Sequence, residues 1–129
     1  MTLASRLAAA ALTALLAGPV PAASMDTGHE IAHLLDYIQS SGCTFVRNGT
    51  PSDAASARAH VARKYEYVRS RVRTAEDFIR LAATQSSVSG APYHVRCGAA
   101  QVRSAEWLAR ELARYRAEAN AAAASTPAR

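Results

Sequence analysis

Two cysteines, Cys43 and Cys97, constrain the fold of this chain more than any other feature of its sequence. An even number of cysteines without a C-x-x-C spacing favours a structural disulfide over redox or metal chemistry, provided that the protein reaches an oxidising compartment. In the chain-entropy model, a bridge that closes the loop between residues 43 and 97 stabilises the fold by roughly 4 kcal/mol. We therefore expect a small domain that a Cys43–Cys97 disulfide cross-links.

The N-terminal segment predicts export to such a compartment. Arg6 precedes an apolar stretch at residues 7–17, and glycine, proline and small residues follow. This order of basic, apolar and small residues is typical of a cleavable signal peptide. The apolar stretch is shorter than the ~20 residues that a membrane-spanning helix needs. We expect cleavage after Ala22, a periplasmic location and no membrane span in the mature protein.

Composition predicts one domain after the signal peptide. The predicted segments are a signal peptide at residues 1–22, a single disulfide-linked helical domain at residues 23–116 and an alanine-rich disordered tail at residues 117–129. Fifteen basic residues stand against ten acidic ones, a formal net charge of +5. Because the basic residues are scattered without a run, this charge does not predict nucleic-acid binding.

Apolar periodicity and capping residues predict about four helices. Thr27 and Glu30 have the spacing of an N-cap and its capping-box partner, and Ser104 is a second candidate N-cap. Thr50 and Pro51 have the order of a cap followed by a proline at the first helical position. The predicted helices cover residues 27–40, 50–72, 74–82 and 104–116.

Two extended segments complete the predicted fold. Residues 43–47 end at an Asn48-Gly49 turn, and residues 91–97 follow a polar loop at residues 84–90. Pairing of the two segments would bring the cysteines together. The predicted fold class is α+β, predominantly α, with a short two-stranded or extended element stapled by the disulfide.

An ordered set of short motifs spans about residues 30–116. The set consists of Phe45 to Gly49, His60 with Lys64-Tyr65, Ala75 to Ile79, Ser86 to Tyr93, Cys97 and Trp107-Leu108. In this order the motifs resemble the YfeK-like proteins, small exported bacterial proteins grouped as a domain of unknown function. The resemblance implies a periplasmic location and supports the disulfide, and it implies no activity.

One motif points to zinc chemistry. His29, Glu30 and His33 match the H-E-x-x-H pattern, in which two histidines bind zinc and the glutamate activates water. At about 100° per residue, both histidines project away from the apolar stripe of their helix, so we expect them to face solvent. Because no third ligand is evident, we expect at most a weak surface chelate.

A second motif is found in periplasmic lysozyme inhibitors. Ser89 to Tyr93 has the S-G-x-x-Y form of the loop that those inhibitors insert into the lysozyme cleft. The alternative is a turn shaped by Gly90 and Pro92, with Tyr93 packed beside the disulfide. The inhibitors are rich in β-structure, whereas this chain is predicted to be mostly helical.

A polar ridge is predicted on the second helix. His60, Lys64, Tyr67 and Arg71 recur at spacings of three and four residues, so they share one helix face. Lys64 is the only lysine of an arginine-rich chain, and lysine and arginine side chains bind anions differently. Arg47 lies four residues after Cys43 in the same extended segment, so both side chains are on one face, and Arg47 is expected near the ridge. The alternative is a solvated helix flank with no ligand.

These features favour a non-catalytic binding or interaction module over an enzyme. We expect no cofactor, and the partner is either an unknown periplasmic protein or a small anionic ligand. The alternatives that stay open are a lysozyme inhibitor and a small zinc-dependent or serine hydrolase. The candidate binding residues are Arg47, His60, Lys64, Tyr67, Arg71, Ser86, Ser87, Ser89 and Tyr93.

Overall fold

The computed structural model describes residues 10, 11, 13, 14 and 23–125. Nearly all of the predicted signal peptide, including its cleavage site, therefore lies outside the described residues. Within the described part, no helix combines the length and the apolar character that crossing a membrane requires.

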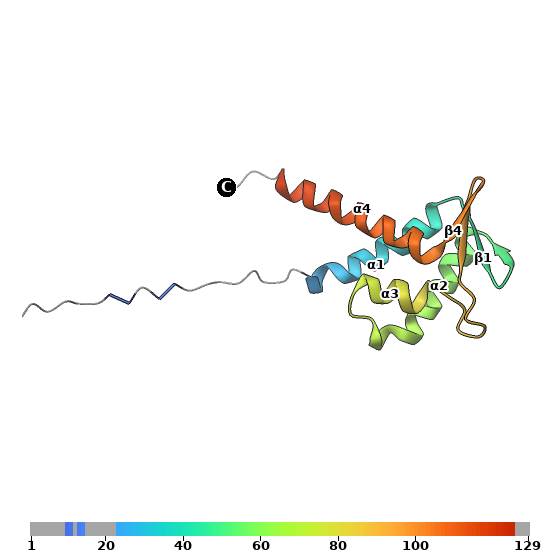
Figure 1. Ribbon diagram of the computed structural model, residues 1–129, viewed down its shortest axis with the longest axis horizontal. Helices are drawn as coiled ribbons and strands as arrows, with labels where there is room; N and C mark the ends of the chain where they lie inside the picture. Colours follow the sequence, from blue (N-terminus) through green and yellow to red (C-terminus); the bar gives the residue numbers. More distant parts are fainter. Residues whose placement is uncertain (1–9, 12, 15–22, 126–129) are drawn as a thin grey trace, which may run out of the picture.

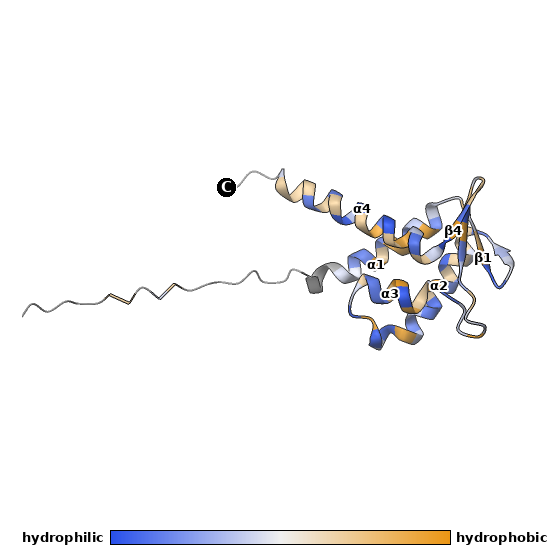
Figure 2. Cartoon of the chain, viewed as in Figure 1, coloured by the Kyte–Doolittle hydropathy of each residue, from blue (hydrophilic) through white to orange (hydrophobic). Residues whose placement is uncertain are grey.

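Four helices form one part of the molecule, and a sheet lies at one end of them (Figure 1). The helices contact one another, and α4 also contacts strands β3 and β4 of the sheet. Apolar and polar residues both occur along α2, α3 and α4, as expected for helices with one buried face (Figure 2). The helical elements are α1 (Ala23–Ser40), α2 (Ala54–Val68), the 3-10 turn η1 (Arg69–Arg71), α3 (Ala75–Ala82) and α4 (Ser104–Ala124).

The sheet has four antiparallel strands in the order β2-β1-β3-β4. Its strands are β1 (Thr44–Arg47), β2 (Thr50–Ser52), β3 (His94–Cys97) and β4 (Ala100–Arg103). Asn48 and Gly49 form the turn between β1 and β2 with φ angles of 50° and 75°. Positive φ at both central residues is the signature of a type I′ hairpin turn. The predicted fold class, α+β and mostly helical, is confirmed, although the sheet is larger than the predicted two-stranded element.

The two additional strands lie at the edges of the sheet, and this explains why their sequences did not reveal them. Residues 50–52 were expected to begin a helix, but Pro51 lies in edge strand β2, where its missing N–H costs no ladder hydrogen bond. Strand β4 is mostly exposed, and only Val102 in it is partly buried, so it lacks an apolar alternation.

Three of the predicted helix starts require correction. The side chain of Asp53, and not of Thr50, caps α2 by accepting a hydrogen bond from the backbone N–H of Ser56 at 2.7 Å. Helix α1 begins at Ala23, so Thr27 lies inside it. The N-cap of α4 is Arg103, and Ser104 is a buried residue of the first turn. By contrast, Thr74 caps α3 as predicted, accepting from the N–H of Asp77 at 3.1 Å.

The core lies where the helices meet the sheet. Its largest fully buried side chains come from α1, α3, β3 and α4: Leu34, Ile38, Phe78, Val95 and Leu108. The predicted disulfide between Cys43 and Cys97 is present and links the start of β1 to the end of β3. The loss of the apolar pattern after Arg116 predicts a disordered tail. In the structure α4 instead continues to Ala124, away from the sheet (Figure 1).

Candidate functional site

A concavity of about 430 Å³ lies between α2, the β1–β2 turn and the loop that precedes β3. We call it the outer concavity. It brings together most of the residues that the sequence predicted for a binding surface, although they come from three separate segments. Its lining consists of Arg47, Asn48, His60, Arg63, Lys64, Tyr67, Val68, Ser86, Ser87, Val88 and Tyr93.

A chain of hydrogen bonds crosses the outer concavity from Arg47 through His60 to Tyr93. The Nη1 of Arg47 lies 2.7 Å from Nδ1 of His60 and 3.3 Å from its Nε2, and Nε2 lies 3.1 Å from Oη of Tyr93. A guanidinium group only donates, so the short contact requires a lone pair on Nδ1. The proton of the neutral imidazole is then on Nε2, and Nε2–H donates to Tyr93.

His60 is held in its neutral form. Burial of the imidazole is the largest cause that lowers the pKa of His60 below its ordinary value, and the positive charges of Arg47, Lys64 and Arg63 lower it further. A neutral imidazole agrees with the tautomer that Arg47 requires. The positive charge around the concavity is therefore carried by the guanidinium and ammonium groups alone.

Lys64 joins α2 to the loop before β3. Its ammonium donates to the backbone carbonyl oxygen of Gln85 and to Oη of Tyr93, the latter at 3.1 Å. The same Nζ atom lies 4.9 Å from the ring centroid of Tyr93, within cation–π distance. Because Oη of Tyr93 accepts from both His60 and Lys64, its own hydroxyl hydrogen is left to donate to a ligand or to solvent.

The loop at residues 84–90 is held by hydrogen bonds of its own serine side chains and of Asn48. Ser86 is buried, and its Oγ accepts hydrogen bonds from Nδ2 of Asn48 and from the backbone N–H groups of Val88 and Ser89, all at 3.2 Å. Ser89 donates from Oγ to Oδ1 of Asn48 at 2.6 Å. The Asn48-Gly49 turn therefore fixes one edge of the outer concavity.

Comparisons with known proteins place the chain in a family. Residues 25–116 match the model of a family of unknown function, DUF5329. The chain belongs to this family. It is also 36% identical over 78 residues to a protein described as uncharacterized protein YfeK from Salmonella typhimurium strain LT2.

The match with YfeK covers 57% of this chain and 65% of the relative, so the chain spans less than two thirds of the length of the curated protein that it matches. No solved structure matches. The resemblance to an uncharacterised YfeK-like family is thus confirmed. Neither description assigns an activity, so the site of this DUF5329 chain has to be interpreted from its own geometry.

Two predicted residues do not line the outer concavity. Arg71 lies in η1 and is exposed, outside the lining. Ser89 contacts Asn48 instead. The sequence did not single out Asn48, Arg63 and Val88 as site residues; Arg63 precedes Lys64 directly, but a one-residue step gives no signal of a shared helix face.

The charge of the outer concavity is of one sign. Arg47, Arg63 and Lys64 contribute three cations, and no Asp or Glu is among the residues that line it. Tyr67 and Val88 also belong to the lining and are 89% and 97% exposed. The candidate site of this chain therefore combines positive charge, hydroxyl groups and exposed apolar surface.

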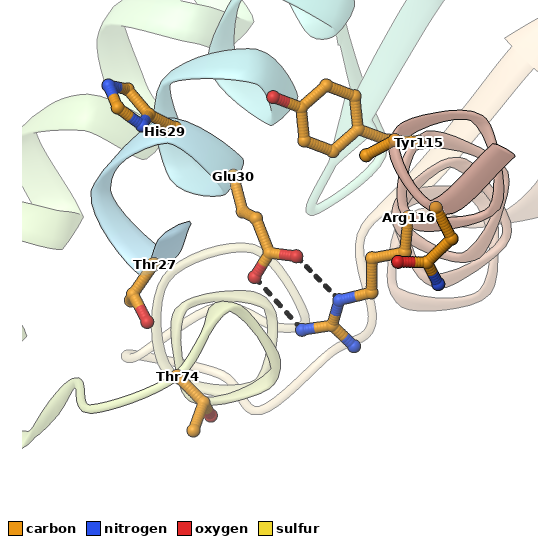
Figure 3. Close-up of a pocket in the computed structure, with 8 residues that line it drawn as sticks. Thr27, His29, Glu30, Thr74, Tyr115 and Arg116 are labelled. Carbon is orange, nitrogen blue, oxygen red and sulfur yellow. Dashed lines mark hydrogen bonds and ion pairs between the residues drawn. The ribbon is translucent and has the colours of Figure 1, made fainter. Parts of the chain in front are cut away.

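A second pocket, of about 380 Å³, lies between α1 and α4 and includes the N-cap residue of α3, Thr74 (Figure 3). Glu30 is buried there and accepts two hydrogen bonds from Arg116, at 2.6 and 3.0 Å. Arg116 also binds Glu76, and this pairing lowers the pKa of Glu76. The role predicted for Glu30 in a capping box is therefore wrong. The negative charge of the Glu30 carboxylate is already balanced by Arg116.

The zinc motif is divided between two environments. His29 is exposed and points away from the Glu30–Arg116 pair in Figure 3. His33, which was expected to face solvent, is only 27% exposed; its Nε2 lies 2.7 Å from Oε1 of Glu111 and its ring stacks on Tyr115 at 4.1 Å. The described residues include no group of three His, Cys, Asp or Glu side chains placed to hold a metal ion.

Proposed function

We propose that this DUF5329 protein is a non-catalytic binding module that binds a small anionic ligand in the outer concavity. The observation that carries the proposal is the charge of this surface: three cationic side chains, from β1 and α2, surround one concavity whose lining holds no carboxylate. Its volume of about 430 Å³ also falls in the range of small-molecule sites.

The hydrogen-bonding groups support the same ligand class. Lys64 and Arg47 supply charged donors, and a charge-assisted hydrogen bond is about twice as strong as a neutral one. The hydroxyl of Tyr93 adds a neutral donor, because its oxygen is already occupied by His60 and Lys64. Lys64 is partly withdrawn from water, which strengthens its attraction for an anion.

A hydrolase has less support from this geometry. Nucleophilic catalysis needs a hydroxyl within hydrogen-bond reach of a base. Ser86 instead bonds to Asn48 and to backbone N–H groups, and His60 bonds to Arg47 and Tyr93. A zinc-dependent hydrolase also has less support, because Nε2 of His33 is paired with Glu111 and is not free to bind a metal ion.

The lysozyme-inhibitor alternative also has less support. It requires Ser89 and Tyr93 to extend into a partner's cleft. Tyr93 is only 7% exposed, and its hydroxyl oxygen lies within hydrogen-bond distance of His60 and Lys64. Ser89 is tied to Asn48.

Export to the periplasm forms part of the proposal. The signal-peptide order of the first 22 residues motivates it, and the Cys43–Cys97 disulfide supports it because such bonds persist in oxidising compartments. An anion-binding protein in the periplasm would meet small ligands from the surroundings of the cell.

Calorimetric titration of the purified protein with inorganic phosphate, sulfate and acetate tests the ligand class. We expect saturable binding of at least one anion, and a loss of about tenfold or more in affinity for Lys64→Met, since a charged hydrogen bond contributes about 1.5–3 kcal/mol. Arg110→Gln is the matched control, because Arg110 is an exposed cation on α4 outside the outer concavity. This control should bind as the wild type does.

The stability of the variants has to be measured beside their affinity. Val61→Ala removes buried methyl groups and serves as a core reference, with an expected cost of roughly 1–3 kcal/mol. If Lys64→Met destabilises the fold as much, Arg63→Gln replaces it as the test, because Arg63 is exposed. Absence of anion binding by the wild type, or equal losses in Arg63→Gln and Arg110→Gln, would contradict the proposal.

A further inference from the structure

A third cavity, of about 150 Å³, adjoins the outer concavity, and we call it the inner cavity. Four side chains line both of them: Arg47, His60, Arg63 and Tyr93. Hydrogen bonds join three of these residues, from Arg47 to His60 and from His60 to Tyr93. The Arg47–His60–Tyr93 chain therefore lines both cavities, which form two adjoining parts of one site.

The compartments differ in chemistry. Apolar groups from the core, including Ile38, Phe45, Ala57 and Val61, form one side of the inner cavity. Val46, three serines and the residues shared with the outer concavity form the rest, and no carboxylate lines it. The inner cavity thus offers apolar contact directly behind the positively charged surface.

The size of the inner cavity limits what it can hold. An apolar cavity of about 150 Å³ has room for a group of the size of a benzene ring. A longer chain or a fused ring system would exceed it. A single ring that entered this space would leave its anionic substituent on the side of Arg47, Arg63 and Lys64.

We infer that the ligand is a small anion that carries one apolar group of about the size of a single ring. The anionic group occupies the outer concavity and the apolar group occupies the inner cavity, so the ligand lies along the Arg47–His60–Tyr93 chain that lines both. This inference rests on the proposed anion-binding function and narrows its ligand class. The half-buried His60 belongs to this shared lining, and its imidazole contacts both parts of the ligand.

Two phosphate monoesters that differ in their apolar group test the inference by calorimetric titration. Phenyl phosphate carries the ring, and methyl phosphate carries the same anionic group without it. We expect phenyl phosphate to bind the wild type about tenfold or more tightly, because burial of a ring removes apolar surface from water. Equal affinity for the two esters would overturn the inference.

Substitutions on α2 locate the ring. Ala57→Leu fills the inner cavity, and we expect it to abolish the preference for phenyl phosphate over methyl phosphate. Ala59→Leu adds the same side chain at an exposed position of the same helix and should retain the preference. If Ala57→Leu overpacks the core and lowers the melting temperature, Ser56→Leu takes its place, since Ser56 is exposed and lines the inner cavity.

The outcomes separate this inference from the proposed function. If methyl and phenyl phosphate bind equally and Lys64→Met weakens both, the anion site stands and the ring-binding inference fails. If neither these esters nor inorganic phosphate, sulfate and acetate bind, the proposed function fails, and the inference fails with it. A preference for phenyl phosphate that persists in both the Ala57→Leu and Ser56→Leu variants would place the ring outside the inner cavity and overturn the inference.

Discussion

At the scale of single residues, Arg47 and His60 show how one contact determines the tautomer of a neutral imidazole. Arg47 donates to Nδ1 of His60, and this contact leaves the imidazole proton on Nε2, facing Tyr93. Protonation of Nδ1 would break the contact and place a fourth cation beside Arg47, Arg63 and Lys64. Burial of the imidazole opposes that proton first, and the neighbouring charges oppose it further.

We predict that His60 titrates below the ordinary histidine value of about 6.5. The unfolded chain then binds the proton more readily than the folded chain. The free energy of unfolding therefore falls as the pH decreases from about 6.5 toward the folded-state pKa of His60. An NMR titration of the imidazole signals, assigned through His60→Gln, measures this pKa.

Arg63→Gln is the control for the cause of the shift. It removes one of the cations but leaves the contacts of His60 with Arg47 and Tyr93 in place. The pKa of His60 should rise only part of the way, because burial is the larger cause. A wild-type pKa at or above the ordinary value would contradict the tautomer and the charge assignment together.

At the scale of elements, short-range capping positions α2 and hence the residues of the site that α2 carries. The Asn48-Gly49 turn reverses the chain, β2 pairs with β1, and Asp53 then begins α2. This sequence of elements places Arg47, at the end of β1, next to His60 on α2. The start of α2 is therefore a determinant of the site as well as of the fold.

We predict that Asp53→Ala lowers the free energy of unfolding by about 1 kcal/mol, because it removes the side chain that accepts from the N–H of Ser56. Thr50→Ala should change it by less than about 0.5 kcal/mol, since Thr50 is an exposed residue of an edge strand and not a helix cap. Urea unfolding of both variants measures the difference. A larger loss for Thr50→Ala would reverse the assignment of the cap.

At the scale of the whole molecule, one covalent bond and several long-range hydrogen-bonded side-chain pairs join distant segments of the described residues. The disulfide links the start of β1 to the end of β3. Glu30 and Arg116 join α1 to α4, as do His33 and Glu111. The pKa of Glu111 is lowered, first by its hydrogen bond with Arg114 and then by His33, so its carboxylate stays charged in this contact.

We predict that the full-length chain, produced in a bacterium with a periplasm, is recovered there without residues 1–22 and with an intact disulfide. The intact mass before and after reduction measures both. The double variant Cys43→Ala/Cys97→Ala should lose roughly 2–5 kcal/mol of stability, as is usual when a small exported domain loses its bridge. Retention of residues 1–22 would contradict export, and two free thiols in the unreduced protein would contradict the bridge.

The sequence by itself determined the features that depend on neighbouring residues. The positive φ angles at Asn48 and Gly49 and the cap of α3 by Thr74 are local preferences, so a short segment reveals them. The spacing of His60 and Lys64 likewise placed both on one helix face. The cysteine pair was predictable because a chain with two cysteines has a single possible intramolecular bridge.

Tertiary structure alone decided the features that depend on distant contacts. Strand β2 and strand β4 exist because each finds a partner strand, and neither carries an apolar pattern of its own. Glu30 lies 86 residues from Arg116, and His33 lies 78 residues from Glu111, so no local signal predicts either pair. The outer concavity has the same origin: α2 supplies His60 and Lys64, but only sheet pairing and loop closure bring Arg47 and Tyr93 to them.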